Sequence, residues 1–155
     1  MSSEVKSFMS LFRGYESAHG QYRVKKEEDD GKVSGRAITV SEPATEQNYI
    51  EHLTGSDYIL GIIMLQQDNT CNFGAIDIDI RGNVKLNESL EELEKKIRKT
   101  PLVLCRSKSG GAHLYLFCKP AIPAIDMVAK LNEFAAGLGY GGAEIFPKQI
   151  SRANE

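Results

Sequence analysis

The amino-acid sequence predicts an α+β fold, and two observations carry this prediction. Apolar residues alternate with polar ones in several short segments, as in strands, and recur every three to four residues in two longer segments, as in helices. In the second half of the chain the expected elements are a strand at 75–80, a helix at 87–99, strands at 102–106 and 113–118, a helix at 123–137 and a strand at 143–146. This βαββαβ order is that of the ferredoxin-like fold, which RRM modules share.

Local signals define the helices of this half. Ser89 and Glu92 have the spacing of a capping box, and Thr100-Pro101 ends the first helix. The second begins near Pro123 and ends in the glycine-rich segment 137–142. With right-handed crossovers, the four strands take the spatial order fourth, first, third, second. The first strand is then central, and its end lies beside the starts of both neighbours.

The first half of the chain has weaker signals. The expected elements are a short helix around 8–12, a turn through 13–23, an exposed hairpin tip or loop at 25–32, a short strand at 36–40, a helix at 46–53 and a strand buried on both faces at 59–65.

Length and charge limit the possible classes. A chain of 155 residues with 41% hydrophobic residues can form one domain, residues 1–155. A net charge of -2 excludes a protein held on nucleic acid by bulk positive charge. Basic residues do gather locally, and a nucleic-acid track or solvated surfaces explain them equally well; they are Arg23, Lys25, Lys26, Lys95, Lys96, Arg98, Lys99, Arg106 and Lys108.

The cysteines and the hydropathy pattern indicate the compartment. Cys71, Cys105 and Cys118 are scattered and form no C-x-x-C motif, so neither a zinc site nor a disulfide framework is expected. The N-terminus lacks the apolar stretch of a signal peptide, and no run approaches the ~18 apolar residues of a membrane helix. We therefore expect a soluble protein in the reducing cytoplasm, without a membrane partner.

An acidic pair marks the expected central strand. In Ala75-Ile76-Asp77-Ile78-Asp79-Ile80, alternation puts Asp77 and Asp79 on one face, about 6.6 Å apart along the strand. Carboxylates at this spacing can bind one or two hard divalent cations, Mg²⁺ or Mn²⁺. Two solvated aspartates on an open sheet face would give the same pattern, although aspartate is disfavoured within strands.

Further polar residues converge on the same edge of the sheet. His113 opens the third strand, after the hydroxyl-rich and glycine-rich loop Ser107-Lys108-Ser109-Gly110-Gly111, which is suited to binding phosphates but is also ordinary hairpin material. Glu144 opens the fourth strand, and Lys148 follows it. The convergence of these residues predicts a site with Asp77, Asp79, His113 and Glu144 as its catalytic residues.

At these residues the sequence resembles the archaeo-eukaryotic primase superfamily, the primase-polymerases. The three segments that carry the resemblance are the acidic pair in 75–79, the small-residue loop 107–113 that ends in His113, and the hydrophobic-acidic segment 143–149. Its Glu-Ile-Phe-Pro-Lys-Gln sequence is similar to primase domains of phages, mobile elements and TOTE-type conflict systems. Residues 11–14 and 68–71 also resemble this subgroup.

The resemblance implies a fold and a function. An N-terminal αβ unit, 1–73, would pack on an RRM-like unit, 74–150, with the active site between them. Asp77, Asp79 and Glu144 would bind Mg²⁺ or Mn²⁺. The triphosphate and sugar would be held by Ser107, Ser109 and His113, with phosphate contacts from Lys108, Lys148 and the glycines of the loop, Gly110 and Gly111. Arg13 would reach the site from the N-terminal unit.

The implied activity is template-directed nucleotidyl transfer, as in a DNA primase or polymerase. A DNA template and nucleoside triphosphates would be its partners, with a helicase or another replication module in the full-length protein. Domains of this subgroup usually continue beyond the Pro-Lys-Gln segment, so the chain is expected to be C-terminally truncated and incompletely active.

Other functions compete with this one. A noncatalytic RRM-like nucleic-acid-binding module would use the aromatic residues Tyr115 and Phe117 to stack bases. A palm-type nucleotide cyclase or a degenerate, structural primase domain would share the fold. A rolling-circle nicking enzyme needs a His-hydrophobic-His pair, which His19, His52 and His113 do not form.

Overall fold

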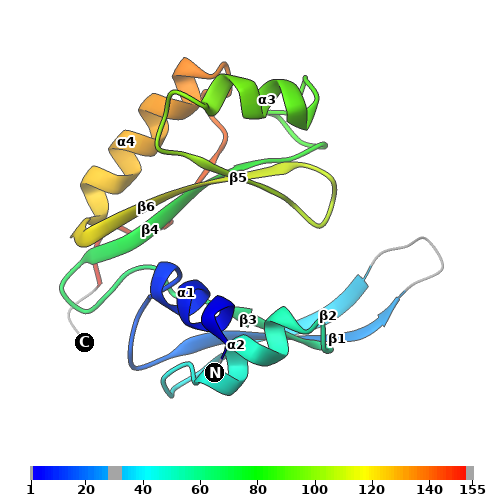
Figure 1. Cartoon of the computed structure of the whole chain (residues 1–155), viewed down its shortest axis with the longest axis vertical. Coiled ribbons are helices and arrows are strands. Elements are labelled where there is room, and N and C mark those ends of the chain that lie inside the picture. The colour runs from blue at the N-terminus through cyan, green and yellow to red at the C-terminus, as the bar shows by residue number, and fades with distance from the viewer. Residues whose placement is uncertain (1, 28–32, 153–155) are drawn as a thin grey trace. The chain divides into compact units, whose positions relative to one another are not determined.

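The chain divides into two units, Met1–Gln66 and Gln67–Glu155 (Figure 1). The computed structural model describes residues 2–27 and 33–152. We expected a boundary after residue 73, but strand β4 already begins at Thr70, so residues 70–73 belong to the sheet of the second unit. Both units combine helices with an antiparallel sheet, which agrees with the α+β class.

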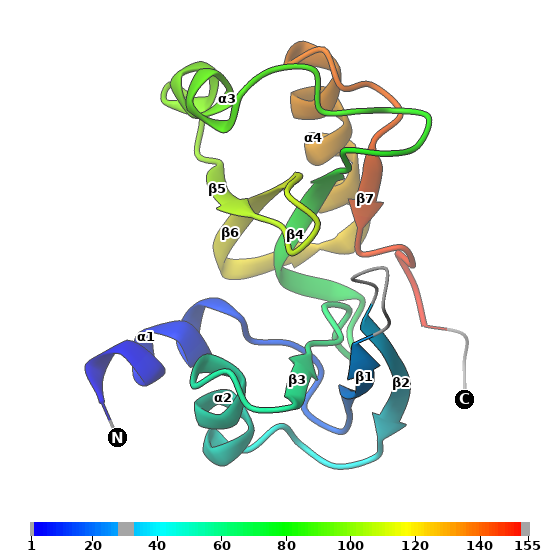
Figure 2. The ribbon, with the colours of Figure 1, turned by 90° about the vertical axis from the view of Figure 1, so that its right-hand side faces the viewer.

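The first unit has a three-stranded sheet of order β2-β1-β3. Its elements are α1 (Ser3–Leu11), β1 (His19–Glu27), β2 (Val33–Val40), α2 (Glu46–Leu53) and β3 (Tyr58–Gly61). Both helices lie on one side of the sheet (Figure 2). They are joined by a hydrogen bond of 2.9 Å from the Tyr49 hydroxyl to the Phe12 carbonyl oxygen, and by the Phe8 ring, whose centroid lies 6.2 Å from that of Tyr49.

Two expectations for this unit are wrong. Residues 19–27 form a strand rather than a turn, because β2 and β3 pair with its two edges and satisfy a backbone whose polar side chains do not indicate a strand. The expected strand at 59–65 ends at Gly61 and lies at a sheet edge. Ile62 and Ile63 line a cavity, and Leu65 is buried, which explains the apolar run.

The remaining expectations for the first unit are confirmed, although the helix expected around 8–12 begins earlier, at Ser3, and ends at Leu11. Helix α2 has the expected bounds, with Thr45 and Asn48 as its capping box and Gly55 beyond its end at a φ of 74°. Strand β2 includes the expected 36–40 and pairs with β1 as a hairpin. Residues 28–32 of the expected hairpin tip lie outside the described residues.

The second unit has a four-stranded antiparallel sheet of order β5-β6-β4-β7. Its elements are β4 (Thr70–Ile78), α3 (Leu90–Ile97), β5 (Val103–Arg106), β6 (Ala112–Pro123), α4 (Ala124–Gly137) and β7 (Glu144–Phe146). The order of elements and the strand order match those expected, with β4 central beside β6 and β7. Several boundaries differ: β4 begins at Thr70 and ends before Asp79, α3 is shorter than the expected 87–99, and β6 continues to Pro123.

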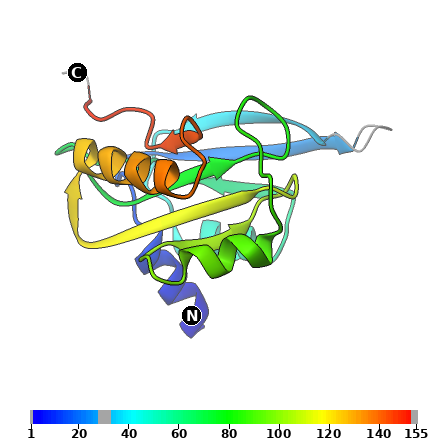
Figure 3. The same ribbon diagram turned by 90° about the horizontal axis from the view of Figure 1, so that it is seen from above.

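The core of the second unit lies between its sheet and its helices. Helices α3 and α4 cover the same face of the sheet (Figures 1 and 3). On that face Ile76 and Ile78 of β4 and Leu114 of β6 are fully buried. Gly74 allows α4 to approach, since a Cβ at this position would lie 2.7 Å from Leu131 Cδ1. The opposite face of the sheet carries the acidic and aromatic side chains.

A polar network joins the two helices of this unit. The Tyr140 ring is buried after the end of α4, and its hydroxyl lies 2.6 Å from Glu88 Oε2 and 2.9 Å from Asn87 Oδ1, just before α3. Lys96 of α3 forms an ion pair of 2.7 Å with Glu88. Burial and the Glu88 carboxylate raise the pKa of Tyr140 to about 12, so its hydroxyl remains a donor.

Within the described part of the chain, no helix has the length and apolar content needed to cross a bilayer.

The packing of α4 makes a quantitative prediction. Leu131 is 0 % exposed, whereas Ile125 on the same helix is 57 % exposed. We expect Leu131→Ala to lower the free energy of unfolding by about 2–5 kcal/mol, because it leaves a cavity against β4. The matched variant Ile125→Ala should change it by less than about 1 kcal/mol. Urea unfolding would measure both, and equal effects would contradict the packing described here.

Candidate functional site

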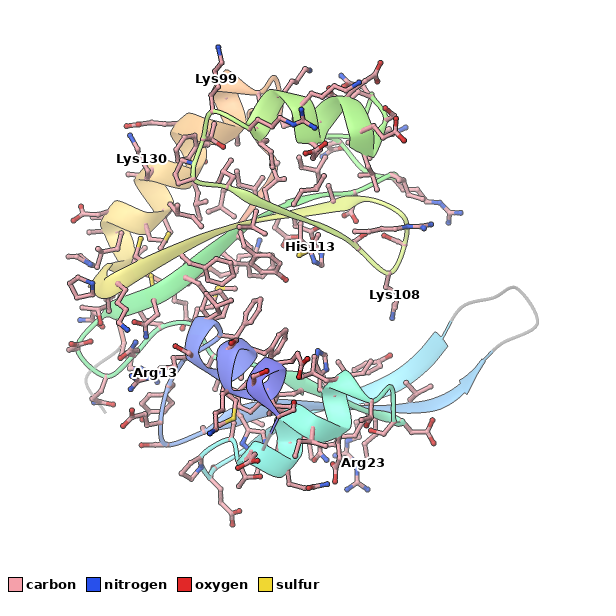
Figure 4. All side chains as sticks on the ribbon, viewed as in Figure 1. Arg13, Arg23, Lys99, Lys108, His113 and Lys130 are labelled. Carbon is pink, nitrogen blue, oxygen red and sulfur yellow. The ribbon has the colours of Figure 1, made fainter. Side chains whose placement is uncertain are left out.

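Strand pairing places three of the expected site residues in one row across the sheet. Asp77 of the central strand β4 is the register partner of His113 in β6 on one side and of Glu144 in β7 on the other. Residues directly opposite each other in a sheet share a face. Their neighbours Ile76 and Leu114 point into the helix-covered core, so Asp77, His113 and Glu144 lie on the other face. Figure 4 shows His113 on this side of the sheet, away from α3 and α4.

Asp77 is the least solvated member of the row. Its side chain is 21 % exposed, and its Oδ1 atom lies 3.4 Å from His113 Nε2. This separation allows Coulombic attraction but forms no hydrogen bond, so Oδ1 is buried without a hydrogen-bond partner in the described structure. A buried carboxylate oxygen that lacks a hydrogen-bond donor is energetically unfavourable by itself, and a bound cation would compensate for this cost.

The electrostatics of Asp77 reflect this crowding. Burial raises the pKa of Asp77 above its usual range; His113 opposes this effect, and the charges of Asp79 and Glu144 add to it. Lys148 has a smaller lowering effect on the same pKa. All four residues therefore lie close enough to Asp77 to act on its charge.

Asp79 does not lie within β4 as expected. The strand ends at Ile78, whose register partner Ala112 is the first residue of β6, so Asp79 has no strand partner there. It instead forms an isolated parallel bridge with Lys85, and its carbonyl oxygen accepts a hydrogen bond of 2.8 Å from the Leu86 N–H. Asp79 thus follows the strand directly and is exposed at its end.

The loop before β6 lies against this strand end. It is closed by a hydrogen bond of 2.9 Å from the Ser107 N–H to the Gly111 carbonyl oxygen and by one of 3.1 Å from the Gly110 N–H to the Ser107 carbonyl oxygen. A Cβ on Gly111 would collide with the Ile78 carbonyl oxygen and lie 3.3 Å from Asp79 Cα. The absence of a side chain at Gly111 therefore lets the loop reach Asp79.

The N–H groups of Ser107 and Gly110 form hydrogen bonds within the loop, so the groups that remain for a ligand are side chains. The hydroxyls of Ser107 and Ser109 are 3.1 Å apart, and Ser107 is 7 % exposed, whereas Ser109 and Lys108 are exposed. Lys108 lies at the end of the loop (Figure 4). Gly110, at a φ of 92°, serves the shape of the turn, since few other residues adopt this conformation.

Lys148 contacts the row through Glu144. Its ammonium forms an ion pair with Glu144 Oε1 and lies 4.9 Å from the centroid of the Phe146 ring. Phe146 shares the face of Glu144, two residues along β7. The Lys148 ammonium is therefore already paired with Glu144, one of the carboxylates expected to bind metal.

One residue that the sequence reasoning left out of the site is Tyr115. Its hydroxyl lies 3.5 Å from His113 Nδ1, and burial raises the pKa of this tyrosine, which keeps the hydroxyl protonated. In the tautomer in which Nδ1 accepts a hydrogen bond from this hydroxyl, the ring carries its hydrogen on Nε2, the atom that faces Asp77. The signal in the sequence was the i, i+2 spacing of His113 and Tyr115 in a strand.

The side chains of the row match a divalent cation in their chemistry but not in their present placement. The donors fit chemically, because Asp77 has a carboxylate oxygen without a hydrogen-bond partner and the carboxylates of Asp79 and Glu144 lie close enough to act on its charge. As placed, however, no three carboxylate, imidazole or thiolate side chains among the described residues converge as metal ligands. The ion pair of Glu144 with Lys148 accounts for part of this, since it turns one carboxylate toward an ammonium.

Arg13 belongs to the first unit. It forms an exposed ion pair of 3.1 Å with Glu16 and lines a cavity of about 610 Å³ in that unit, together with the buried residues His19 and Tyr49. His19 is fixed there by a contact of 2.8 Å between its Nδ1 and the Glu42 carbonyl oxygen. None of the other expected site residues lines this cavity.

Burial and the neighbouring carboxylates raise the pKa of Asp77, which predicts a pH-dependent gain in stability when this carboxylate is replaced. A carboxyl with a raised pKa is unfavourable when charged, so Asp77→Asn should raise the melting temperature of the metal-free protein at neutral pH by a few degrees. The gain should shrink as pH falls through the raised pKa and vanish below the ordinary one, where the wild-type carboxyl is also neutral. Differential scanning calorimetry across this range would measure it.

A matched control is Asp57→Asn at an exposed position. It should leave the melting temperature nearly unchanged. A loss of stability in Asp77→Asn at neutral pH would mean that the carboxylate is stabilised by contacts other than those described.

A family model described as "TOTE conflict system, Archaeo-Eukaryotic Primase domain" matches residues 3–136. The match spans both units and includes the acidic pair and the loop before β6, but it ends before Glu144 and Lys148. No curated protein matches the chain.

Proposed function

Since the chain belongs to the archaeo-eukaryotic primase domain family of the TOTE conflict system, we propose that it is a metal-dependent nucleotidyltransferase that extends a nucleic-acid strand along a template. Membership of this family supports a primase-like nucleotidyl transfer in general terms. The observation that carries the more specific proposal is the row of Glu144, Asp77 and His113 in strand register, with an orphaned carboxylate oxygen at its centre.

The arrangement of the second unit supports an RRM-like assignment. Its sheet order and its two helices on one face are those of the ferredoxin-like class, in which the other face of the sheet is available for function. The acidic row lies on that available face. A polymerase palm uses such a face in the same way, by presenting carboxylates from its central strand.

Each residue has a proposed role. Asp77, Asp79 and Glu144 would hold Mg²⁺ or Mn²⁺, which when bound would activate a 3′-hydroxyl and neutralise charge on the phosphates. Ser109 and Lys108 would contact the triphosphate from the loop, and Ser107 would support Ser109 through its hydroxyl. His113, oriented by Tyr115, would donate a hydrogen bond from Nε2 to Asp77 or to a phosphate oxygen. Nucleoside triphosphates and a DNA template would be the substrates.

Lys148 has two alternative partners in this proposal. In the ligand-free structure it neutralises Glu144. A bound metal would replace it there, and the ammonium would then be available to a triphosphate oxygen. In such an exchange the Lys148 ammonium would leave Glu144 and pair with the negatively charged triphosphate instead, so it would not be left without an anionic partner.

A second candidate function is noncatalytic binding of single-stranded nucleic acid. The observation in its favour is the group of aromatic rings on the same face, where the centroids of Tyr115 and Phe117 are 5.8 Å apart. Against it, Phe73, which completes the group, is 2 % exposed and cannot stack on a base. Three nearby carboxylates would also repel phosphates unless a metal intervened.

Primer extension tests the proposed activity. We expect a labelled primer on a DNA template to be extended with Mn²⁺ or Mg²⁺ and not with a chelator present. Asp77→Ala/Asp79→Ala should reduce the rate by about 10²-fold or more, since it removes two of the three carboxylates. Asp126→Ala, on the exposed surface of α4, is the control. Extension that is unaffected by the chelator or by the double substitution would refute the site, whereas binding without extension would favour the noncatalytic function.

The exchange of Lys148 makes a separate prediction. Lys148→Met keeps a long side chain over the Phe146 ring but removes the charge that pairs with Glu144. We expect Mn²⁺ to bind this variant more tightly in the absence of nucleotide, by up to about fivefold, which is the range for an exposed ion pair. Isothermal titration calorimetry would measure the affinity.

Lys130→Met is its control, because Lys130 pairs with Glu133 on the exposed surface of α4. It should bind Mn²⁺ with the affinity of the wild type. An unchanged or weaker affinity in Lys148→Met would show that this lysine does not compete with the metal.

A further inference from the structure

The β1–β2 hairpin extends beyond the sheet to which it belongs. Strand β3 pairs with β1 only from Gly20 to Arg23, whereas β2 continues to pair with β1 as far as Glu27. Past Val24, whose N–H still bonds the Asp57 carbonyl oxygen, the hairpin is therefore a two-stranded ribbon. Strand β2 is a sheet edge, and its residues 35–39 are all exposed.

Two arginines lie side by side at the base of this ribbon. Arg23 of β1 and Arg36 of β2 are register partners and share a face, and both are exposed. Figure 4 shows Arg23 at the edge of the first unit. Like charges directly opposite each other in a sheet are destabilising, so this pair opposes the stability of the hairpin.

No ion pair among the described side chains compensates for this pair. Neither guanidinium forms an ion pair with any side chain that the structure describes, in residues 2–24 and 35–152. Glu51 of α2 lies in the neighbourhood, because it and Arg23 act in opposite directions on the pKa of Tyr58, the β3 partner of Arg23. The Glu51 carboxylate accepts a hydrogen bond of 3.0 Å from Gln47 instead.

Other basic groups of the sequence are accounted for differently. On α3, Arg98 pairs with Glu94 at 3.1 Å and Lys96 with Glu88, as expected of a solvated helix surface. The arginines of the ribbon have no such partners. The chain adds Lys25 and Lys26 after Arg23, and then four acidic residues at 27–30. In the sequence, the basic residues are thus followed directly by acidic ones.

We infer that Arg23 and Arg36 form a contact for the phosphodiester backbone of a nucleic-acid strand at the base of the β1–β2 ribbon. Adjacent guanidiniums present several N–H donors to phosphate oxygens, and a bound phosphate relieves their mutual repulsion. The choice of nucleic acid over another polyanion rests on the proposed template-directed function.

Salt-dependent binding tests this inference. Fluorescence anisotropy would measure the affinity of the whole chain for a single-stranded oligonucleotide and for a duplex, in EDTA, as a function of salt concentration. In Arg23→Gln/Arg36→Gln the slope of log K against log salt should decrease by about 1.4 for the single strand or about 1.8 for the duplex, because two phosphate contacts are lost. Whichever substrate shows the full decrease is the form that the ribbon binds.

Matched variants isolate the role of these two positions. Arg98→Gln/Lys130→Gln removes the same charge from ion-paired positions elsewhere and should keep the wild-type slope. Arg23→Lys/Arg36→Lys retains both charges and should retain most of the slope. The melting temperature of Arg23→Gln/Arg36→Gln should be no lower than that of the wild type, because a like-charge pair is removed, so lost binding would not reflect unfolding.

The outcomes separate this inference from the proposed function. An equal loss of slope in both Gln double variants, or no measurable binding of the wild type at low salt, would overturn the inference. Polyglutamate that displaces the oligonucleotide at equal charge concentration would also overturn it, in favour of an acidic protein partner. Primer extension that fails while ribbon-dependent binding persists would count against the proposed catalysis alone.

Discussion

The pairing of β4 with a strand on each side is the constraint on which the candidate site depends. A central strand has no free edge, so its register with β6 and β7 determines which side chains become neighbours. Here that register brings Asp77 beside His113 and Glu144, residues that are 36 and 67 positions away along the chain, as the difference between their numbers gives. The apolar residues that alternate with Asp77 hold this register, since they must remain under α3 and α4.

The site combines stabilising and destabilising features in a small area. Burial of Asp77 Oδ1 without a hydrogen bond, and three carboxylates close together, oppose folding of the ligand-free protein. The Glu144–Lys148 ion pair and the approach of His113 Nε2 to Asp77 offset part of this. The balance suits a site that gains stability when a cation binds, because a ligand that binds only the folded state shifts the equilibrium toward it.

Much of the second unit could be predicted from its sequence. Periodicity and the capping signals at Ser89 and Pro101 located the elements, and the rules of strand order then placed His113 and Glu144 beside Asp77. The position of Asp79 could not be predicted in this way. Its pattern continues that of the strand, but the strand ends where its partner β6 begins, and that length depends on the loop before β6.

The first unit was harder to predict for a related reason. Strand β1 has polar residues on an exposed ribbon, and its formation depends on hydrogen bonds with β2 and β3 rather than on an apolar face. The apolar run after β3 reflects a cavity wall and a buried residue instead of a longer strand. Likewise, the Lys148–Glu144 pair and the contact of Tyr115 with His113 depend on side-chain rotamers, which a sequence pattern does not specify.

The register shift in β4 between Cys71 and Phe73 limits where this strand can change in length. Side chains in a strand alternate, so one residue inserted between Phe73 and Asp77 would turn the carboxylate toward the helices and Ile76 toward the solvent. The irregularity upstream already accommodates a mismatch between β4 and β6. Insertions and deletions among relatives should therefore be tolerated near Cys71, whereas the five residues from Phe73 to Asp77 should keep a constant length.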